Sequence, residues 1–311
     1  MKILALSDTR FPTNLNYPGH GLGRSMARLT QELARQGHMV TLFAAHGSKV
    51  GGVRVLPDDN EAERGKWLAS VGETETYDAI IDGTHEFTLA NLRPDLPIVC
   101  KVVDRENPAP YRRVYGNTTL KSWLNDGQPY ELVIEGVDIN NIPYYPAGRG
   151  TNLVWTGYKQ AMWKRPELAI QIAEKAGRPL MMIGEGLPLE RVLDRHSHWS
   201  ETSGFTGTTF YKWLGCAYAL VQPVASMATL EAAATGTPSL GMMLEDDWVM
   251  PTVSGALATT VEEAAELIKD GYLESLSKWQ MRTWVGDERN VTQMAKKWAE
   301  LLQRAADGET W

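Results

Sequence analysis

The sequence predicts an α/β protein made of two doubly wound parallel-sheet domains. Short, continuously apolar segments recur along the chain, as buried parallel strands require. Segments with one apolar face at helical spacing alternate with them, which is the pattern of a doubly wound sheet. The length of 311 residues matches about two domains of ordinary size. Each half therefore has enough chain to build a core of its own.

The first half begins with a strand, a helix and a second strand. Residues 3–7 form a short apolar run, and Met26, Leu29 and Leu33 then recur at helical spacing until Gly37 ends the helix. This succession predicts a parallel βαβ unit with a right-handed crossover. The strands expected in this half are 3–7, 39–44, 79–81, 98–103 and 132–134.

The second half repeats the alternation after a break. Residues 142–150 hold two prolines and two glycines and are interpreted as a linker. The strands expected after it are 152–156, 180–183, 219–221 and 239–241, and the helices are 166–176, 227–235, 261–270 and 289–306. The predicted domains are an N-terminal Rossmann-like domain at 1–146, a second at 147–285 and a C-terminal helix at 286–311 that packs back on the first. Ligands are expected in a cleft that faces the carboxyl ends of both sheets.

Composition limits the classes of function. An apolar content of 43% and a charged content of 22% are ordinary for a globular protein, and a net charge of −7 disfavours binding of nucleic acid over a wide surface. Without an apolar run of membrane-spanning length or a signal peptide, a cytoplasmic location is expected. Cys100 and Cys216 lie in apolar surroundings and are expected to be buried free thiols.

A glycine-rich turn, Gly19-His20-Gly21-Leu22-Gly23-Arg24, leads into the first helix. Gly21 and Gly23 would let the backbone come close to a diphosphate, as glycine does in phosphate-binding loops. A flexible loop before a helix explains the same residues, because the spacing is not that of the dinucleotide-binding fingerprint. This motif alone does not decide between the two interpretations.

Two cations, Lys164 and Arg165, directly precede Pro166 at a predicted helix start. Cations are disfavoured at a helix N-terminus by the helix dipole, so the pair indicates a bound anion. The alternative is a solvated surface pair. A second helix start carries Glu231 one turn inside it, and the amides of Ser226, Met227 and Ala228 before it can receive a phosphate. For Glu231 the alternative is an acid that complements the helix dipole.

His85 and Glu86 follow the strand at 79–81 through Gly83-Thr84. A polar pair at the carboxyl end of a strand can contact substrate hydroxyls, or it can cap the next helix. His196-x-His198 is interpreted as a surface turn. The chain has no Asp-x-Asp and no Cys-x-x-Cys, so no metal ligands and no metal cofactor are expected.

In order along the chain, these segments resemble the glycosyltransferases of the two-Rossmann (GT-B) architecture, nearest to family 4, whose members retain the anomeric configuration of a nucleotide sugar. The matching segments are 21–23 with 37–43, 84–86, 133–138 with 143–146, 164–169, 183–186 and 230–238. The resemblance covers nearly the whole chain. It implies a transferase that moves a sugar from a nucleotide-diphosphate donor to a hydroxyl.

The resemblance also implies roles for single residues. Lys164 would neutralise the donor diphosphate and Glu231 would hold the ribose hydroxyls. His85 would contact the transferred sugar. The remaining donor-binding residues that it implies are Gly21, Gly23, Lys159, Arg165, Gly184, Ser226, Met227, Ala228 and Thr229. The nucleotide sugar is a substrate, and no cofactor is implied.

The chain departs from the family pattern at three positions. The family pairs two acids eight positions apart, whereas Pro223 stands eight positions before Glu231. Tyr158 stands where the family has an arginine, for which Lys159 is the substitute. Glu135 stands where the family has an asparagine. Two alternatives therefore stay open: a nucleotide-sugar epimerase of the same architecture, and a catalytically silent nucleotide-sugar-binding protein. The acceptor is not assigned. Aromatic and basic residues at 9–20 and 104–118 are expected to face it or solvent: Phe11, Tyr17, Arg105, Tyr111, Arg112, Arg113 and Tyr115.

Overall fold

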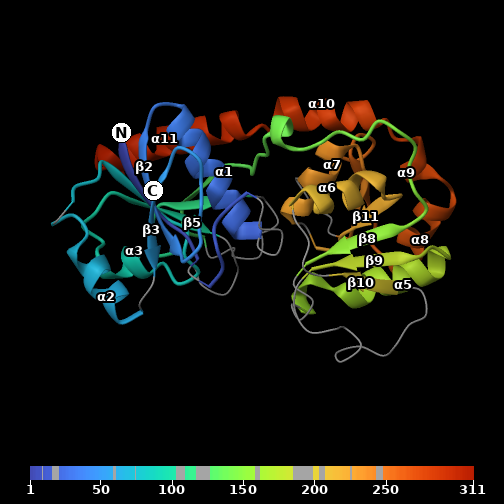
Figure 1. The fold of residues 1–311 in the computed structure, drawn as a ribbon, viewed down its shortest axis with the longest axis horizontal. Helices are drawn as coiled ribbons and strands as arrows, with labels where there is room; N and C mark the ends of the chain where they lie inside the picture. Colours follow the sequence, from blue (N-terminus) through green and yellow to red (C-terminus); the bar gives the residue numbers. More distant parts are fainter. Residues whose placement is uncertain are drawn as a thin grey trace. The chain divides into compact units, whose positions relative to one another are not determined.

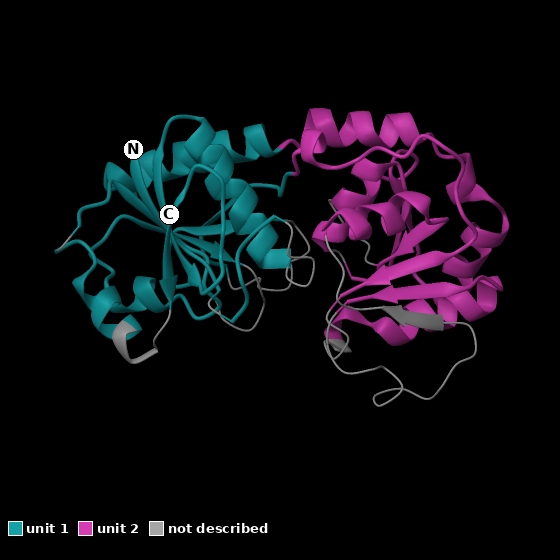
Figure 2. Cartoon of the chain, in the orientation of Figure 1, with its two compact units in different colours: residues 1–136, 291–311 teal, residues 137–290 magenta. Residues whose placement is uncertain are grey.

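The chain forms two compact units. Unit 1 comprises Met1–Gly136 and Val291–Trp311, and unit 2 comprises Val137–Asn290 (Figure 2). The computed structural model describes residues 1–8, 10–15, 21–58, 61–73, 75–102, 109–116, 127–157, 162–184, 199–202, 207–224, 226–242 and 248–311.

Unit 1 is built on a parallel sheet of seven strands in the order β3-β2-β1-β4-β5-β6-β7 (Figure 1). The strands are β1 (Lys2–Leu6), β2 (Met39–Ala45), β3 (Arg54–Asp58), β4 (Ala79–Asp82), β5 (Ile98–Val102), β6 (Arg113–Tyr115) and β7 (Tyr130–Leu132). The register pairs Ile3 with Val40 on one side of β1 and Leu6 with Asp82 on the other. The predicted parallel sheet is confirmed.

Side chains alternate between the two faces of this sheet, as the period of a strand requires. Ile3 and Ala5 belong to a core shared with helices α1 (Gly21–Arg35) and α11 (Val291–Ala306). Leu4 and Leu6 belong to a second core shared with α2 (Glu61–Ser70) and α3 (Thr88–Leu92). Both faces are buried, which explains why these strands are continuously apolar.

Unit 2 repeats the same plan with a parallel sheet of six strands in the order β10-β9-β8-β11-β12-β13. The strands are β8 (Leu153–Thr156), β9 (Leu180–Ile183), β10 (Trp199–Thr202), β11 (Ala219–Val221), β12 (Ser239–Gly241) and β13 (Gly255–Leu257). The helices are α5 (Pro166–Ala176), α6 (Gly207–Cys216), α7 (Met227–Thr235), α8 (Val261–Lys269), α9 (Tyr272–Ser275) and α10 (Lys278–Glu288), with short 3₁₀ turns η1 (Ile139–Asn141) and η2 (Met162–Lys164).

The helices of unit 2 form two groups. Helix α5 packs against α8, whereas α7 packs against α6 and α10 (Figure 1). Pro166 opens α5, and Gly177 and Gly236 end α5 and α7 in the left-handed conformation that favours glycine. These helix ends confirm the signals in the sequence.

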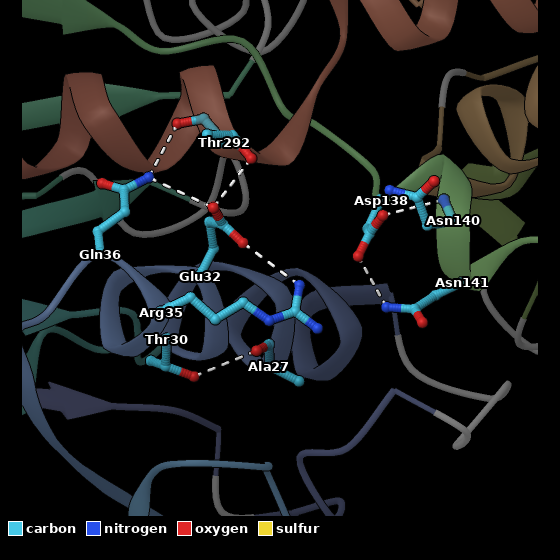
Figure 3. A network of polar contacts seen from close by, with 9 residues as sticks. All are labelled: Ala27, Thr30, Glu32, Arg35, Gln36, Asp138, Asn140, Asn141 and Thr292. Carbon is cyan, nitrogen blue, oxygen red and sulfur yellow. Dashed lines mark hydrogen bonds and ion pairs between the residues drawn. The ribbon is translucent and has the colours of Figure 1, made fainter.

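The last helix belongs to unit 1. Trp298 and Leu302 of α11 are buried in the core that also holds Leu29 of α1. Between the two helices, the Thr292 hydroxyl donates to Glu32 Oε1 (2.9 Å), and Gln36 Nε2 donates to the Thr292 carbonyl (3.1 Å; Figure 3). This polar contact fixes the N-terminal end of α11 against α1.

The units divide at 136/137 and 290/291, whereas the sequence placed the divisions at 146/147 and 285/286. Residues 137–150 are held by unit 2: the Tyr145 amide donates to the Thr235 carbonyl (3.1 Å), and Arg282 donates to the carbonyls of Ile142 (3.0 Å) and Ala234 (2.6 Å). Asp138 accepts from the Asn140 amide and the Asn141 side chain, which starts η1 (Figure 3). The segment at 142–150, which is rich in proline and glycine, is therefore part of unit 2 and packs along it, rather than linking the two units.

Candidate functional site

The two sheets share one feature that locates ligands in folds of this kind. In each sheet the strand order reverses next to the first strand, between β1 and β4 in unit 1 and between β8 and β11 in unit 2. Loops after the carboxyl ends of such strands diverge to opposite faces and leave a crevice where ligands bind. The carboxyl-end side of each sheet at this point is called the edge of unit 1 or the edge of unit 2.

The start of α7 follows β11 at the edge of unit 2. Ser226 has the extended backbone of an N-cap, yet its hydroxyl makes no capping hydrogen bond. Thr229, one turn later, is 1% exposed. Within the part of the chain that the structure describes, neither hydroxyl has a hydrogen-bond partner. Helices α8 and α10 in the same unit are capped in the usual way by Thr260 and Ser277.

Unpartnered buried hydroxyls beside the first amides of a helix are a costly arrangement. A buried polar group without a hydrogen bond costs about 1–3 kcal/mol, and helix-start amides favour an anion. The amides of Met227 and Ala228 belong to this first turn. Glu231 is completely buried one turn further along the same helix. The structure thus brings together the Ser226, Thr229 and Glu231 positions that the sequence predicted.

Gln222 holds the two central strand ends of unit 2 together. Its side chain accepts from the Thr156 amide (3.4 Å) and donates to the Thr156 carbonyl (3.1 Å). The backbone pairing of β8 and β11 ends at Val154 and Leu220, so this side chain extends the ladder where the strand order reverses. Sequence analysis missed Gln222 because nothing local distinguishes it from other polar residues after a strand.

Lys164 and Arg165 lie at the start of α5, after β8. The Lys164 ammonium lies 4.3 Å from the ring centroid of Trp163, which is 53% exposed. Arg165 has a left-handed backbone, and its side chain pairs with Glu167 in the first turn of the helix. This ion pair favours a solvated surface position for Arg165, which is the second of the two interpretations of the sequence. Trp163 was not singled out in the sequence, although an aromatic residue beside the cationic pair was a usable signal.

Gly184 follows β9 and lies against the loop after β8. A Cβ atom at this position would stand 1.8 Å from the Gly157 carbonyl oxygen, so only glycine fits there. The Gly157 amide donates to the Ile183 carbonyl (3.1 Å) across the same junction. This close approach accounts for Gly184 without a ligand; its predicted contact with the donor stays a prediction.

At the edge of unit 1, Asp8 follows β1 and His85 follows β4. Asp8 is 5% exposed, and its Oδ2 lies 3.3 Å from Nε2 of His85. Arg10 donates to both carboxylate oxygens, from Nε to Oδ1 (3.0 Å) and from Nη2 to Oδ2 (2.7 Å). Sequence analysis did not single out Asp8. The contact between Asp8 and His85 is tertiary and has no local signal.

The glycine-rich turn meets the structure at the first residues of α1. Gly21 is partly exposed, and a Cβ atom there would have no neighbour within 4 Å among the residues that the structure describes. Gly23 is buried in the first turn of the helix. The space beside Gly21 is compatible with the close approach of a ligand. Other predicted residues lie outside the described residues: Gly19, His20, Lys159, Glu185, Gly186, His196 and His198.

The aromatic and basic cluster expected to face an acceptor or solvent is largely structural. Arg112 is buried and donates to the carbonyls of Ile98 (3.4 Å) and Glu309 (2.7 Å). Arg113 and Tyr115 are also buried, on β6. This expectation was wrong for these three residues, because the segment forms an inner strand of the sheet. Tyr17 and Arg105 lie outside the described residues.

Three further expectations concern thiols, metals and membranes. Cys100 is buried, whereas Cys216 is exposed at the end of α6, so burial was predicted wrongly for Cys216. Both are free. Among the described residues, no three His, Cys, Asp or Glu side chains are grouped to hold a metal ion. None of the helices in the described part of the chain is both long and apolar enough to cross a membrane.

No protein-family model and no curated protein matches the chain. Solved structures do match over nearly its whole length. AviGT4, a glycosyltransferase involved in avilamycin A biosynthesis, superposes with a TM-score of 0.79 at 19% identity, covering 100% of this chain and 99% of that chain. Sucrose-phosphate synthase from Thermosynechococcus elongatus gives 0.75 at 12%, covering 99% and 100%. HepE from Anabaena, in complex with UDP-glucose, gives 0.68 at 14%, covering 97% and 99%.

These matches fit the two strand orders described above, each of which is that of a Rossmann-like sheet. Identities of this size establish a fold and leave substrates open. The chain therefore has the two-Rossmann GT-B fold that these glycosyltransferases share, as the sequence predicted.

Proposed function

We propose that this chain is a glycosyltransferase that moves a sugar from a nucleotide-diphosphate donor to a hydroxyl acceptor, with retention at the anomeric carbon. The observation that carries the proposal is the start of α7, where the hydroxyls of Thr229 and Ser226 have no hydrogen-bond partner among the described residues and lie beside helix-start amides. A phosphate supplies acceptors for both kinds of donor. Glu231, buried one turn further, is suited to accept hydrogen bonds from ribose hydroxyls.

The difficult event in such a transfer is departure of the nucleoside diphosphate. Its developing negative charge would be met by the amides before and within the first turn of α7 and by the ammonium of Lys164. Lys164 lies over the Trp163 ring, a cation–π contact that keeps its charge near the start of α5. Preorganised donors of this kind are worth about 3 kcal/mol each in comparable sites. No metal ion is needed in this scheme.

His85 would contact the transferred sugar from the edge of unit 1, as the family resemblance implies. The fold neighbours support the donor class: HepE is in complex with UDP-glucose, and a second neighbour is an α-glucosyltransferase in complex with UDP-glucose and DNA that contains an abasic site, with a TM-score of 0.63 at 13% identity. The net charge of −7 gives no support for a DNA acceptor in this chain.

The first experiment is a thermal-shift screen of UDP, GDP, ADP, dTDP and CDP sugars. A donor present at a hundred times its dissociation constant should stabilise the fold by about 2.7 kcal/mol. Lys164→Ala should then lower turnover of that donor at least about a hundredfold. Near-wild-type turnover would refute the assignment of Lys164, and absence of any stabilising nucleotide sugar would refute the proposed donor class.

Two threonines of α7 provide a matched pair of variants. Thr229→Val removes a hydroxyl that no described residue of the chain contacts by a hydrogen bond, so we expect about tenfold weaker donor binding and no loss of stability without donor. Thr235→Val removes a hydroxyl that donates to the Ala232 carbonyl (2.7 Å), so it should lower stability slightly and leave donor affinity unchanged. Equal effects of the two variants on donor affinity would contradict a phosphate site at the start of α7.

The epimerase alternative has one observation in its favour. A UDP-N-acetylglucosamine 2-epimerase, described as putative, from Listeria monocytogenes matches the fold with a TM-score of 0.55 at 13% identity. Proton NMR of the reaction mixture separates the alternatives. An epimerised donor formed without acceptor would favour the epimerase, whereas a glycoside with the donor's anomeric configuration would support retaining transfer. A donor that binds and is never consumed would favour a silent binding protein.

A further inference from the structure

We propose that Asp8 is a positioning residue that fixes the orientation and the protonation pattern of the His85 imidazole. The role of His85 in contacting the transferred sugar rests on the proposed function. Its structural part concerns two side chains at the edge of unit 1 and can be measured separately.

Asp8 is held firmly where it is. Its carboxylate is 5% exposed and accepts the Arg10 amide at Oδ1 (2.9 Å) as well as the guanidinium at both oxygens. A bidentate arginine fixes the plane of a carboxylate and favours its ionised form. Arg10 itself is 62% exposed, so the carboxylate is the buried member of the pair.

His85 is oriented by this fixed carboxylate. Its Nε2 lies 3.3 Å from Asp8 Oδ2, an ion-pair contact between two buried atoms that lacks hydrogen-bond geometry. Catalytic contacts that are poorly aligned without substrate often tighten when substrate binds. An ionised carboxylate only accepts hydrogen bonds, so the proton of the neutral ring is drawn to Nε2. Nδ1 is then the nitrogen that carries the lone pair. A carboxylate that holds one ring nitrogen sets the role of the other nitrogen.

Asp82, a second buried acid, lies at the end of β4 and is an example of a carboxylate with a purely structural role. Asp82 is saturated by nearby groups: it accepts the Thr84 hydroxyl (2.6 Å) and the Thr84 amide (3.1 Å) at Oδ1, and the Ala90 amide (3.1 Å) at Oδ2. It thereby caps the turn into α3. The contacts of Asp8 differ in kind, because they include a solvent-exposed guanidinium and a 28% exposed imidazole. A carboxylate needed only for folding would not require the imidazole.

The position in the sheet explains why these residues meet. β1 and β4 are parallel neighbours, and Leu6 pairs with Asp82 at their carboxyl ends. Asp8 and His85 follow these ends directly. A ligand that enters the crevice where the strand order reverses would meet the exposed part of the imidazole, with Asp8 behind it. The neutral ring then presents a hydrogen-bond acceptor to a sugar hydroxyl.

The test compares Asp8→Asn, His85→Gln and the double variant, with Arg54→Gln as a control that removes an exposed ion pair to Glu75 elsewhere in unit 1. Asp8→Asn should lower kcat about 10–100-fold, the range for loss of such a supporting carboxylate. The donor KM should change less than about twofold. In the His85→Gln background the Asp8 substitution should have no further effect. Multiplying losses, or an unchanged kcat, would overturn the proposal.

A spectroscopic measurement decides the matter even if no turnover is found. The chain has six histidines, so ring nitrogen-15 labelling gives few resonances, and the His85→Gln spectrum assigns the one that matters. In the wild-type chain the His85 signals should show a protonated Nε2 and an unprotonated Nδ1, and Asp8→Asn should shift both. Arg10→Met should shift them in the same direction by less. Identical ring signals in wild type and Asp8→Asn would overturn the proposal, whereas failure of the donor screen alone would overturn only the proposed function.

Discussion

A buried ion pair in unit 1 gives a prediction about stability that is independent of the proposed function. Lys101 on β5 is 2% exposed, and its ammonium contacts Oε1 of Glu135, which is 5% exposed. The Ser25 hydroxyl donates to the other carboxylate oxygen (2.8 Å). The ammonium also lies 5.6 Å from the ring centroid of Trp298 on α11. We consider Lys101→Met, Glu135→Gln and the double variant.

The magnitude follows from the burial of both charges. Lys101→Met leaves a buried carboxylate with the Ser25 hydroxyl as its side-chain partner, and Glu135→Gln leaves a buried ammonium without a counter-charge. Removal of one member of a buried pair costs about 3–5 kcal/mol in the free energy of unfolding. The double variant buries no charge there, and the amide of residue 135 can still accept from Ser25. It should lose about 2 kcal/mol or less, which is less than either single variant.

Hydrogen exchange read by mass spectrometry is the suitable assay, because two units need not unfold as one. Amides of β1, β4 and β5 should exchange about a hundredfold faster in each single variant, since about 3 kcal/mol corresponds to that factor. Amides of β8 and β11 in unit 2 should keep their rates and serve as an internal control. If the double variant exchanges faster than both single variants, so that the losses add, the two charges do not compensate each other and the reasoning is refuted.

Two further predictions concern single positions. Gly184→Ala should destabilise unit 2 by about 1–3 kcal/mol, because the new Cβ would stand 1.8 Å from the Gly157 carbonyl. Calorimetry should show this loss, whereas Gly148→Ala, whose Cβ would meet no described residue within 4 Å, should match wild type. Burial raises the pKa of the Cys100 thiol, so this residue should resist alkylation up to about pH 9 in the native chain. The exposed Cys216 should react, and mass spectrometry that finds both thiols modified at similar rates would contradict the prediction.

Much of the fold could be predicted because a buried parallel strand leaves a plain signal. The expected strands at 180–183, 219–221 and 239–241 match β9, β11 and β12. β3 was missed because it is only partly buried and contains Arg54 and Pro57. β6 was missed for the opposite reason: it is buried, but it is short and begins with an arginine.

The strand expected at 132–134 shows how an apolar run can mislead about boundaries. β7 covers Tyr130–Leu132, and the Val133 amide then donates to the Tyr115 carbonyl beyond the end of the strand (3.0 Å). Glu135 lies just after this strand end, and its carboxylate forms the buried ion pair with Lys101. This contact gives a physical reason for an acid where the family pattern has an asparagine, and no local signal in the sequence could reveal the lysine that it meets.

The candidate site divides in the same way between local and tertiary information. Helix starts have sequence signals within a few residues, so the first residues of α5 and α7 were predicted correctly. The pairs Asp8–His85 and Gln222–Thr156 join residues that are far apart in the sequence and meet only because parallel strand ends are neighbours. A single sequence carries no record of such pairs. The polar residues of these pairs can be recognised in the sequence, but the residue that each of them contacts cannot.

The edge of unit 1 and the edge of unit 2 differ in chemistry, and this difference indicates which of them would receive the diphosphate of the proposed donor. At the edge of unit 2, the start of α7 offers helix-start amides and two hydroxyls that lack a hydrogen-bond partner in the described part of the chain, and these groups suit an anion. At the edge of unit 1, the buried carboxylate of Asp8 already neutralises Arg10, and a diphosphate there would face this carboxylate at low local dielectric. An imidazole fixed by a carboxylate instead suits uncharged hydroxyls, whose protons it can accept in a hydrogen bond. The electrostatics of each unit taken alone therefore favour diphosphate binding by unit 2 and sugar-hydroxyl binding by unit 1.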